Sequence, residues 1–227
     1  GYLDTMLSTA SCRIMYGEYC VPQLSHQANG KFAVTEMYHP LIPEGVRNSI
    51  TAERSVLLTG SNASGKSTFI KTVALNAILA QTLHTVLAEN YQASWFCIAS
   101  SMALRDDILS QESYYIVEIR SLKRILDLTR SSELPVLCFI DEVLRGTNTV
   151  ERIAASSRIL QAIAEQGGLC FAATHDIELT YLLEKEYDNY HFEEQVEDDK
   201  VTFDYCLREG RACTRNAIRL LKMLGYD

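Results

Sequence analysis

A glycine-rich loop at residues 60–67 limits this chain to few folds. It reads Gly-Ser-Asn-Ala-Ser-Gly-Lys-Ser and fits the pattern G-x-x-x-x-G-K-[ST]. An apolar run at 55–59 precedes it, and a largely apolar segment at 66–83 follows it at once. This order predicts a buried strand, a tight turn and a buried helix, because glycine permits the turn and a helix that is apolar on all sides lies inside a protein.

The residue types in this loop suit a phosphate group. Its backbone N–H groups and the positive N-terminal end of the following helix would face phosphate oxygens. Lys66 would add a charge for the β- and γ-phosphates, and the Ser67 hydroxyl suits Mg²⁺. We therefore expect ATP or ADP with Mg²⁺ as ligands, and the alternative is a glycine turn before a helix. The residues expected to contact the nucleotide are Gly60, Ser61, Asn62, Ala63, Ser64, Gly65, Lys66, Ser67 and Thr68.

Two further apolar runs end in polar residues that suit the same chemistry. Residues 136–140 lead into Asp141 and Glu142, and residues 169–173 lead through a threonine into His175. Because the carboxyl ends of parallel strands share one edge of a sheet, these side chains are expected near the loop. Asp141 would hold the metal together with the loop serine. Glu142 would be the general base toward the attacking water, and His175 would bond to that water or the γ-phosphate. The alternatives are a cap for the next helix and a structural histidine.

Apolar strands alternate with amphipathic helices along the rest of the chain. A further strand is expected at 94–99, and helices are expected at 121–129 and 151–164. The pattern predicts an α/β fold with a mostly parallel sheet flanked by helices. Residues 201–207 alternate as an antiparallel edge strand, and the acid-rich stretch 184–199 is expected to be a solvated hairpin loop.

Composition narrows the class of protein. The chain has 227 residues, of which 47% are apolar, and this is enough for a real core. No apolar run approaches the roughly 18–20 residues of a membrane-spanning helix, so no direct membrane contact of this fragment is expected. The net charge is −8, whereas an autonomous nucleic-acid-binding domain is usually basic. The seven cysteines show no C-x-x-C spacing, which indicates reduced thiols and a cytoplasmic location.

Together these segments resemble the ATPase domain of the MutS family of DNA mismatch repair proteins, a branch of the ABC ATPases. The family's phosphate loop reads T-G-x-N-x-x-G-K-S-T, which residues 59–68 match, with Asn62 as the discriminating position. Its next motif, D-E-x-x-R-G-T-x-T, matches residues 141–149. Its A-T-H motif, followed by an acid and L-T, recurs at 173–180. The resemblance covers nearly the whole chain.

The resemblance implies an ABC-type P-loop fold in which residues 1–24 end a helical lever and residues 25–227 form the ATPase domain. It also implies a homodimer through this domain, in which the signature-loop residues Ser110 and Ser113 cap the γ-phosphate held by the partner subunit. Gln111 stands where the family has a glycine that allows close backbone approach, so this departure bears on trans activation. The implied interface segment is Arg145, Gly146, Thr147, Asn148 and Thr149.

By the same resemblance, ATP binding and hydrolysis would switch a DNA clamp in mismatch repair, with the DNA contacted by other domains. The alternative is a divergent MutS-like ATPase without mismatch recognition, acting on other DNA structures or in another process. A transporter subunit is disfavoured because Val143 stands where transporters have proline. For a regulatory module without turnover the residues point both ways: Glu142 and His175 argue against it, and Gln111 argues for it. No clear aromatic residue stands at the family's adenine-stacking position, near Gly45 or Val46, so weak base affinity is expected.

Overall fold

A six-stranded main sheet is the centre of the molecule. The computed structural model describes residues 1–26, 30–42, 44–102, 114–144, 148–197 and 200–212. The order of the main sheet is β12-β9-β4-β8-β7-β6. The five strands from β9 to β6 are parallel, and β12 is an antiparallel edge. Their bounds are β4 Ser55–Thr59, β6 Cys97–Ser101, β7 Val136–Asp141, β8 Leu169–Ala173, β9 Tyr187–His191 and β12 Arg208–Glu209. The predicted α/β class is confirmed.

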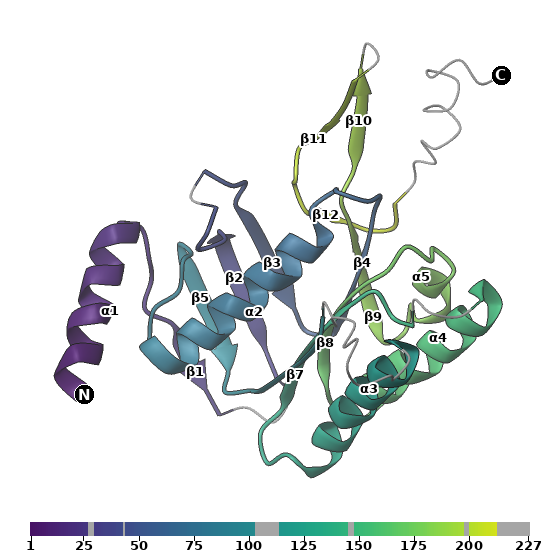
Figure 1. Ribbon diagram of the computed structural model, residues 1–227, viewed down its shortest axis with the longest axis horizontal. Helices are drawn as coiled ribbons and strands as arrows, with labels where there is room; N and C mark the ends of the chain where they lie inside the picture. The colour runs from purple at the N-terminus through teal and green to yellow at the C-terminus, as the bar shows by residue number, and fades with distance from the viewer. Residues whose placement is uncertain (27–29, 43, 103–113, 145–147, 198–199, 213–227) are drawn as a thin grey trace.

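A smaller, mixed sheet lies beside the main one (Figure 1). Its order is β1-β5-β2-β3, in which β2 is antiparallel to both neighbours and β1 is parallel to β5. A two-stranded hairpin, β10 with β11, projects from the same end of the molecule as β12. The bounds are β1 Gln23–Ser25, β2 Phe32–Met37, β3 Asn48–Ala52, β5 Asn90–Ser94, β10 Glu194–Glu197 and β11 Lys200–Phe203.

Alternation along the central strands divides the core into two layers. On β4, Val56 and Leu58 pack with α2 and the small sheet, whereas Leu57 packs with α3 and α4. Side chains of a strand point alternately to opposite faces, so helices cover both faces of the main sheet. The helices are α1 Tyr2–Tyr16, α2 Lys66–Leu83, α3 Tyr114–Ser131, α4 Thr149–Glu165 and α5 Leu179–Leu182. No helix within the described ranges is long and apolar enough to cross a membrane.

The prediction of one strand over 94–99 is wrong, because the chain passes from the small sheet to the main sheet within this segment. Trp95 donates its N–H to the carbonyl of Ser25, and Phe96 donates to the Gln81 side chain at 2.7 Å. The first bond still belongs to the ladder with β1, whereas Phe96 bonds to a side chain of α2, so β5 ends at Ser94 and β6 begins at Cys97 in the main sheet. The break depends on long-range partners that a local apolar pattern does not reveal.

The acid-rich stretch also differs from its prediction as a solvated loop. Its part from Tyr187 to His191 is β9, which pairs in parallel with β4 inside the main sheet. Both terminal side chains of β9 are buried, and Asp188 forms an ion pair with Arg54. Residues 200–203 pair with β10 in the hairpin, so β12 and not 201–207 is the antiparallel edge of the main sheet.

Asn76 ties α2 to the small sheet. Its side chain is fully buried and donates to the carbonyls of Tyr38 and Thr72, at 3.1 and 3.0 Å. Its Oδ1 accepts the N–H of Leu87 at 2.8 Å. A buried backbone group that loses its partner is costly, so this one amide stabilises the junction of helix and sheet.

Replacing Asn76 by leucine, Asn76→Leu, is therefore expected to lower the free energy of unfolding by about 1–3 kcal/mol. The physical reason is that the Tyr38 carbonyl and the Leu87 N–H lose their buried partner. Urea unfolding followed by circular dichroism measures this change. Thr82→Ala, on an exposed position of the same helix, is the control and should stay within about 0.5 kcal/mol of the wild type. Equal midpoints for both variants would contradict the assignment.

Candidate functional site

The glycine-rich loop, residues 60–67, connects the fully buried strand β4 directly to α2. Gly60 has a φ of 145° and Gly65 a φ of 107°, both in the region that favours glycine. A Cβ atom at position 60 would lie 2.8 Å from the carbonyl oxygen of Phe192. The loop therefore packs so closely against Phe192, the residue after β9, that no side chain fits at position 60. Its geometry leaves the first N–H groups of α2 without intrahelical acceptors.

Lys66 is buried at the start of α2, with 4% of its surface exposed. Its Nζ donates to the carbonyls of Gly60 and Ser61, both at 2.7 Å. Lysine is seldom buried to this degree, because an ammonium group loses its hydration there. The loop thus holds a positive charge at its inner side, next to the positive end of the helix.

The carboxyl ends of β4, β8 and β7 bring the predicted polar residues together. Ser67 Oγ donates to Asp141 Oδ1 at 3.0 Å. His175 Nε2 lies 2.7 Å from Glu142 Oε1, so the two side chains share a hydrogen bond. Glu142 lines the same cavity as Lys66 and Ser67. The juxtaposition of these five residues, expected from the parallel order of the strands, is present.

Glu142 lies in a strained turn after β7. Its φ is 60°, and that of Leu144 is 57°, a conformation that residues other than glycine seldom adopt. Three bonds hold the turn: Glu142 N–H to the Ala173 carbonyl, Ser156 Oγ to the Val143 carbonyl, and Leu144 N–H to Glu118 Oε1. The side chain of Glu118 is buried, so its contact with Leu144 is shielded from water. These contacts fix the direction of the Glu142 carboxylate.

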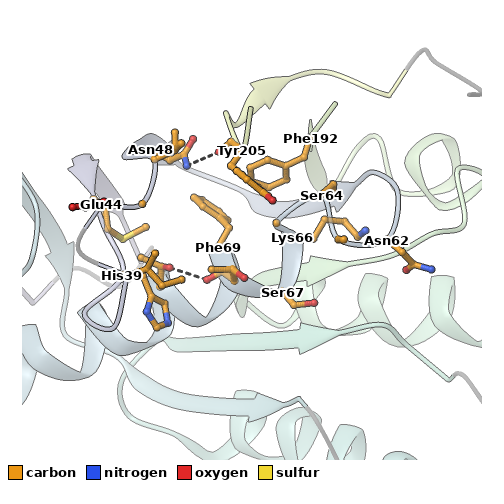
Figure 2. Close-up of a pocket in the computed structure, with 18 of the residues that line it drawn as sticks. His39, Glu44, Asn48, Asn62, Ser64, Lys66, Ser67, Phe69, Phe192 and Tyr205 are labelled. Carbon is orange, nitrogen blue, oxygen red and sulfur yellow. Dashed lines mark hydrogen bonds between the residues drawn. The ribbon is translucent and has the colours of Figure 1, made fainter. Parts of the chain in front are cut away.

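A cavity of about 580 Å³ opens between the glycine-rich loop and the small sheet. Figure 2 shows the loop residues on one side and His39, Glu44 and Asn48 on the other, with Tyr205 and Phe192 between them. Burial lowers the pKa of His39, and the positive charge of Lys71 lowers it further. His39 is therefore neutral at pH 7, and its Nδ1 accepts the N–H of Leu41 at 3.1 Å.

Tyr205 is a site residue that sequence reasoning missed. Its ring lies against the loop, 3.1 Å from where a Cβ of Gly65 would be, and 46% of the residue is exposed to the cavity side and solvent. Asn48 fixes this segment twice, donating to the Tyr205 carbonyl and accepting the N–H of Leu207. The sequence has no clear aromatic residue near Val46, whereas the chain after the hairpin brings Tyr205 to the loop. No local spacing in the sequence connects that chain to the loop.

The comparison with known families gives one match over most of the chain. The model described as MutS domain V matches residues 56–226, which begin in β4 and include the glycine-rich loop. The chain belongs to the MutS family. The matched range also contains the ends of β7 and β8, with Asp141, Glu142 and His175.

Individual MutS proteins are similar over nearly the whole chain. The DNA mismatch repair protein MutS of Natronomonas pharaonis is 30% identical over 231 residues, which cover 98% of this chain and 26% of that protein. The protein of the same name from Pseudothermotoga lettingae is 35% identical over 195 residues, covering 82% and 23%. That of Thermus aquaticus is 29% identical over 227 residues, covering 98% and 27%. The chain spans about a quarter of the length of these relatives.

Part of the family pattern lies outside the described residues. This applies to Ser110, Gln111 and Ser113 of the expected signature loop, and to Arg145, Gly146 and Thr147 of the expected interface segment. The end of that segment is described. Asn148 caps α4 by accepting the N–H of Glu151 at 3.0 Å, and Thr149 is the first residue of the helix.

The contact between Glu118 and Leu144 gives a prediction about the strained turn. Glu118→Leu removes the acceptor and should lower the free energy of unfolding by about 1–3 kcal/mol, whereas Glu118→Gln keeps a carbonyl acceptor and should cost less. Urea unfolding gives the energies, and amide hydrogen exchange at Leu144 reports the bond itself. If the leucine variant left that amide as protected as in the wild type, Glu118 would not hold the turn.

Proposed function

We propose that this chain is the ATP-binding and ATP-hydrolysing domain, of the ABC-type P-loop class, of a MutS-family DNA mismatch repair protein. The observation that carries the proposal is one group of polar residues: Lys66, Ser67 and Glu142 line the cavity, Asp141 is bonded to Ser67, and His175 is bonded to Glu142. A buried lysine in a glycine-rich loop binds phosphate, and a carboxylate beside it can activate water. The match to MutS domain V supports the mismatch-repair assignment over that of a divergent ATPase in another process.

The two walls of the cavity suit the two ends of a nucleotide. The phosphates would lie on the glycine-rich loop, where Lys66 would exchange its bonds to the Gly60 and Ser61 carbonyls for phosphate oxygens. The base would stack on Tyr205, which is aromatic, half-exposed and fixed by Asn48. This contact replaces the missing aromatic residue near Val46 and argues against weak base affinity.

The same residues fit a magnesium ion. Ser67 Oγ and Asp141 Oδ1 lie 3.0 Å apart, and both are oxygen ligands of the kind that Mg²⁺ prefers. These two residues would hold the ion, which when bound neutralises charge on the phosphates. Glu142 Oε1 would accept a proton from the attacking water, and His175 would orient that carboxylate and approach the γ-phosphate.

The proposal extends to the assembly. Residues 1–24 would end a lever, and 25–227 would form the ATPase domain. The lack of buried residues in α1 supports a separate role for that helix, whose Arg13 bonds to the chain at the end of α2. A homodimer would place Ser110 and Ser113 over the partner's nucleotide, and residues 145–149 would connect the two sites. Other domains of the full-length protein would contact DNA, and the nucleotide state would switch them as a clamp. The location would be cytoplasmic.

Substitutions at Lys66 and Glu142 test the enzyme assignment. Lys66→Met should abolish binding of a fluorescent ATP analogue, because the loop loses its phosphate-binding charge. Glu142→Gln should keep binding and slow phosphate release by about 10²–10⁴-fold, because the general base is lost. Lys123→Met, on the exposed side of α3, is the matched control. Unchanged turnover in Glu142→Gln would remove Glu142 as the base.

The base contact has its own test at Tyr205. Tyr205→Ala should raise the Kd for ATP roughly 5- to 150-fold, the range expected for losing about 1–3 kcal/mol of stacking, while Tyr205→Phe should bind nearly as the wild type does. Competition by inorganic triphosphate, which has no base, should be equal in all three proteins. Tyr181→Ala, at an exposed tyrosine of α5, is the control. Equal ATP affinity in the alanine variant and the wild type would exclude the stacking role.

A further inference from the structure

A further cavity, of about 310 Å³, is lined in part by Glu142 and His175. Two of its lining residues, Arg152 and Asp176, have no part in the chemistry described above. Arg152 is in the first turn of α4, and Asp176 directly follows His175. Charged residues that line a cavity with a candidate catalytic pair can position that pair or balance its charge.

Arg152 and Asp176 form a two-pronged ion pair. Arg152 Nε donates to Oδ2 of Asp176 at 2.8 Å, and its Nη2 donates to Oδ1 at 2.6 Å. Asp176 is 9% exposed, whereas the Arg152 side chain is 25% exposed, so the carboxylate is shielded from water and the guanidinium only partly. The hydrogen bond to Asp176 raises the pKa of Arg152, and the negative charges of Asp176, Glu142 and Glu178 raise it further. A guanidinium holds a carboxylate in one orientation, which a lysine does not.

The pair acts on the turn that carries His175. Asp176 donates its N–H to Thr174 Oγ1 at 3.0 Å, and its carbonyl accepts the N–H of Leu179. Thr174 is in turn bonded to the carbonyl of Leu58 in β4. His175 therefore lies between residues that are tied to the main sheet on one side and to α4 on the other.

We propose that Arg152 is a positioning residue: by its two bonds to Asp176 it holds His175 against Glu142, and it joins that contact to the first turn of α4. Because α4 begins at Thr149, at the end of the proposed interface segment, a displacement of this turn would be transmitted to His175. The effect on turnover rests on the proposed ATPase function, whereas the effect on the His175–Glu142 contact does not.

The test compares Arg152→Met with Arg152→Lys in the 227-residue chain. Methionine keeps an apolar side chain but removes both hydrogen bonds to Asp176. Lysine keeps the positive charge but cannot make the two parallel bonds of a guanidinium. The kcat for ATP should fall roughly 10- to 100-fold in Arg152→Met, because a small misplacement of a catalytic group has effects of this size, and KM should change little. Arg152→Lys should give an intermediate kcat. An unchanged kcat, or a change in KM alone, would overturn the effect on turnover.

A second readout needs no nucleotide. The imidazole signal of His175, assigned by its loss in His175→Gln, should move in Arg152→Met in the same direction as in Glu142→Gln, and amide exchange at residues 174–179 should accelerate. If the wild type neither binds nor hydrolyses ATP but these signals change, the proposed function fails and the positioning role stands. If they do not change, the positioning role fails whatever the activity.

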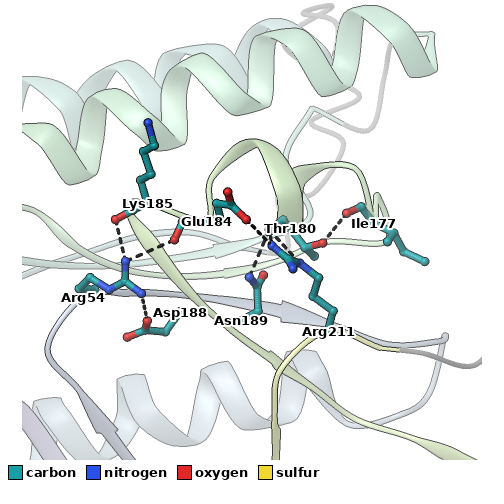
Figure 3. Close-up of polar contacts among 8 residues, drawn as sticks. All are labelled: Arg54, Ile177, Thr180, Glu184, Lys185, Asp188, Asn189 and Arg211. Carbon is teal, nitrogen blue, oxygen red and sulfur yellow. Dashed lines mark hydrogen bonds and ion pairs between the residues drawn. The ribbon is translucent and has the colours of Figure 1, made fainter.

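The control for the Arg152 variants is Arg54, another arginine with several hydrogen bonds. Figure 3 shows Arg54 bonded to Asp188 and to the carbonyls of Glu184 and Lys185. Arg54 precedes β4, so it lies at the opposite edge of the main sheet from the glycine-rich loop. Arg54→Met should lower the melting temperature but leave kcat and the His175 signal unchanged. A fall in kcat equal to that of Arg152→Met would mean that loss of any such pair disturbs the site.

A double substitution tests whether Arg152 acts through Asp176. If Arg152 acts through Asp176, adding Asp176→Asn to Arg152→Met should lower kcat by less than about twofold more, because one interaction has already been lost. Multiplicative effects of the two substitutions would show that they act independently, and this result would overturn the proposal.

Discussion

The parallel ladder of β4, β8 and β7 is the constraint on which the site depends. Leu58 is opposite Ala173, and Ala173 is opposite Asp141, so the three strands end within one residue of the same level. The next residues along each strand then begin the glycine-rich loop, the His175 turn and the Glu142 turn. A shift of one residue in either pairing would turn the side chains to the opposite face. The uniformly apolar cores of these strands, buried on both faces, make such a shift costly.

The site also contains features that oppose stability. Lys66 is a buried cation, and both Glu142 and Leu144 adopt left-handed backbone conformations. Nearby groups offset these costs: carbonyls of the loop accept the ammonium protons, and Glu118 accepts the N–H of Leu144. The surrounding sheet tolerates strain at its carboxyl edge because its interior is regular and fully buried. The strained backbone after β7 directs the Glu142 side chain into the cavity and not into the core.

The sequence was informative where the signal is local. The glycine-rich loop, the acids after β7 and the histidine after β8 each follow an apolar run directly, and the structure joins them as that pattern predicts. Tyr205 and Arg152 had no such signal, because their importance comes from partners distant in the chain, Gly65 and Asp176. For the same reason, the composition of the acid-rich segment does not predict β9. The segment forms a strand because its backbone pairs with β4, and this pairing does not depend on its acidic composition.

The cavity is built by two parts of the fold that are held together differently. The side formed by the glycine-rich loop belongs to the main sheet and α2, whereas the Tyr205 side depends on Asn48 of β3 and on the chain after the hairpin. Asn48 bonds to backbone groups on both sides of Cys206, so the position of Tyr205 is fixed by the small sheet. A nucleotide in contact with both walls would join the small sheet to the glycine-rich loop. The proposed switch would then act at this junction, since the parallel ladder of the main sheet is too deeply buried to change its register.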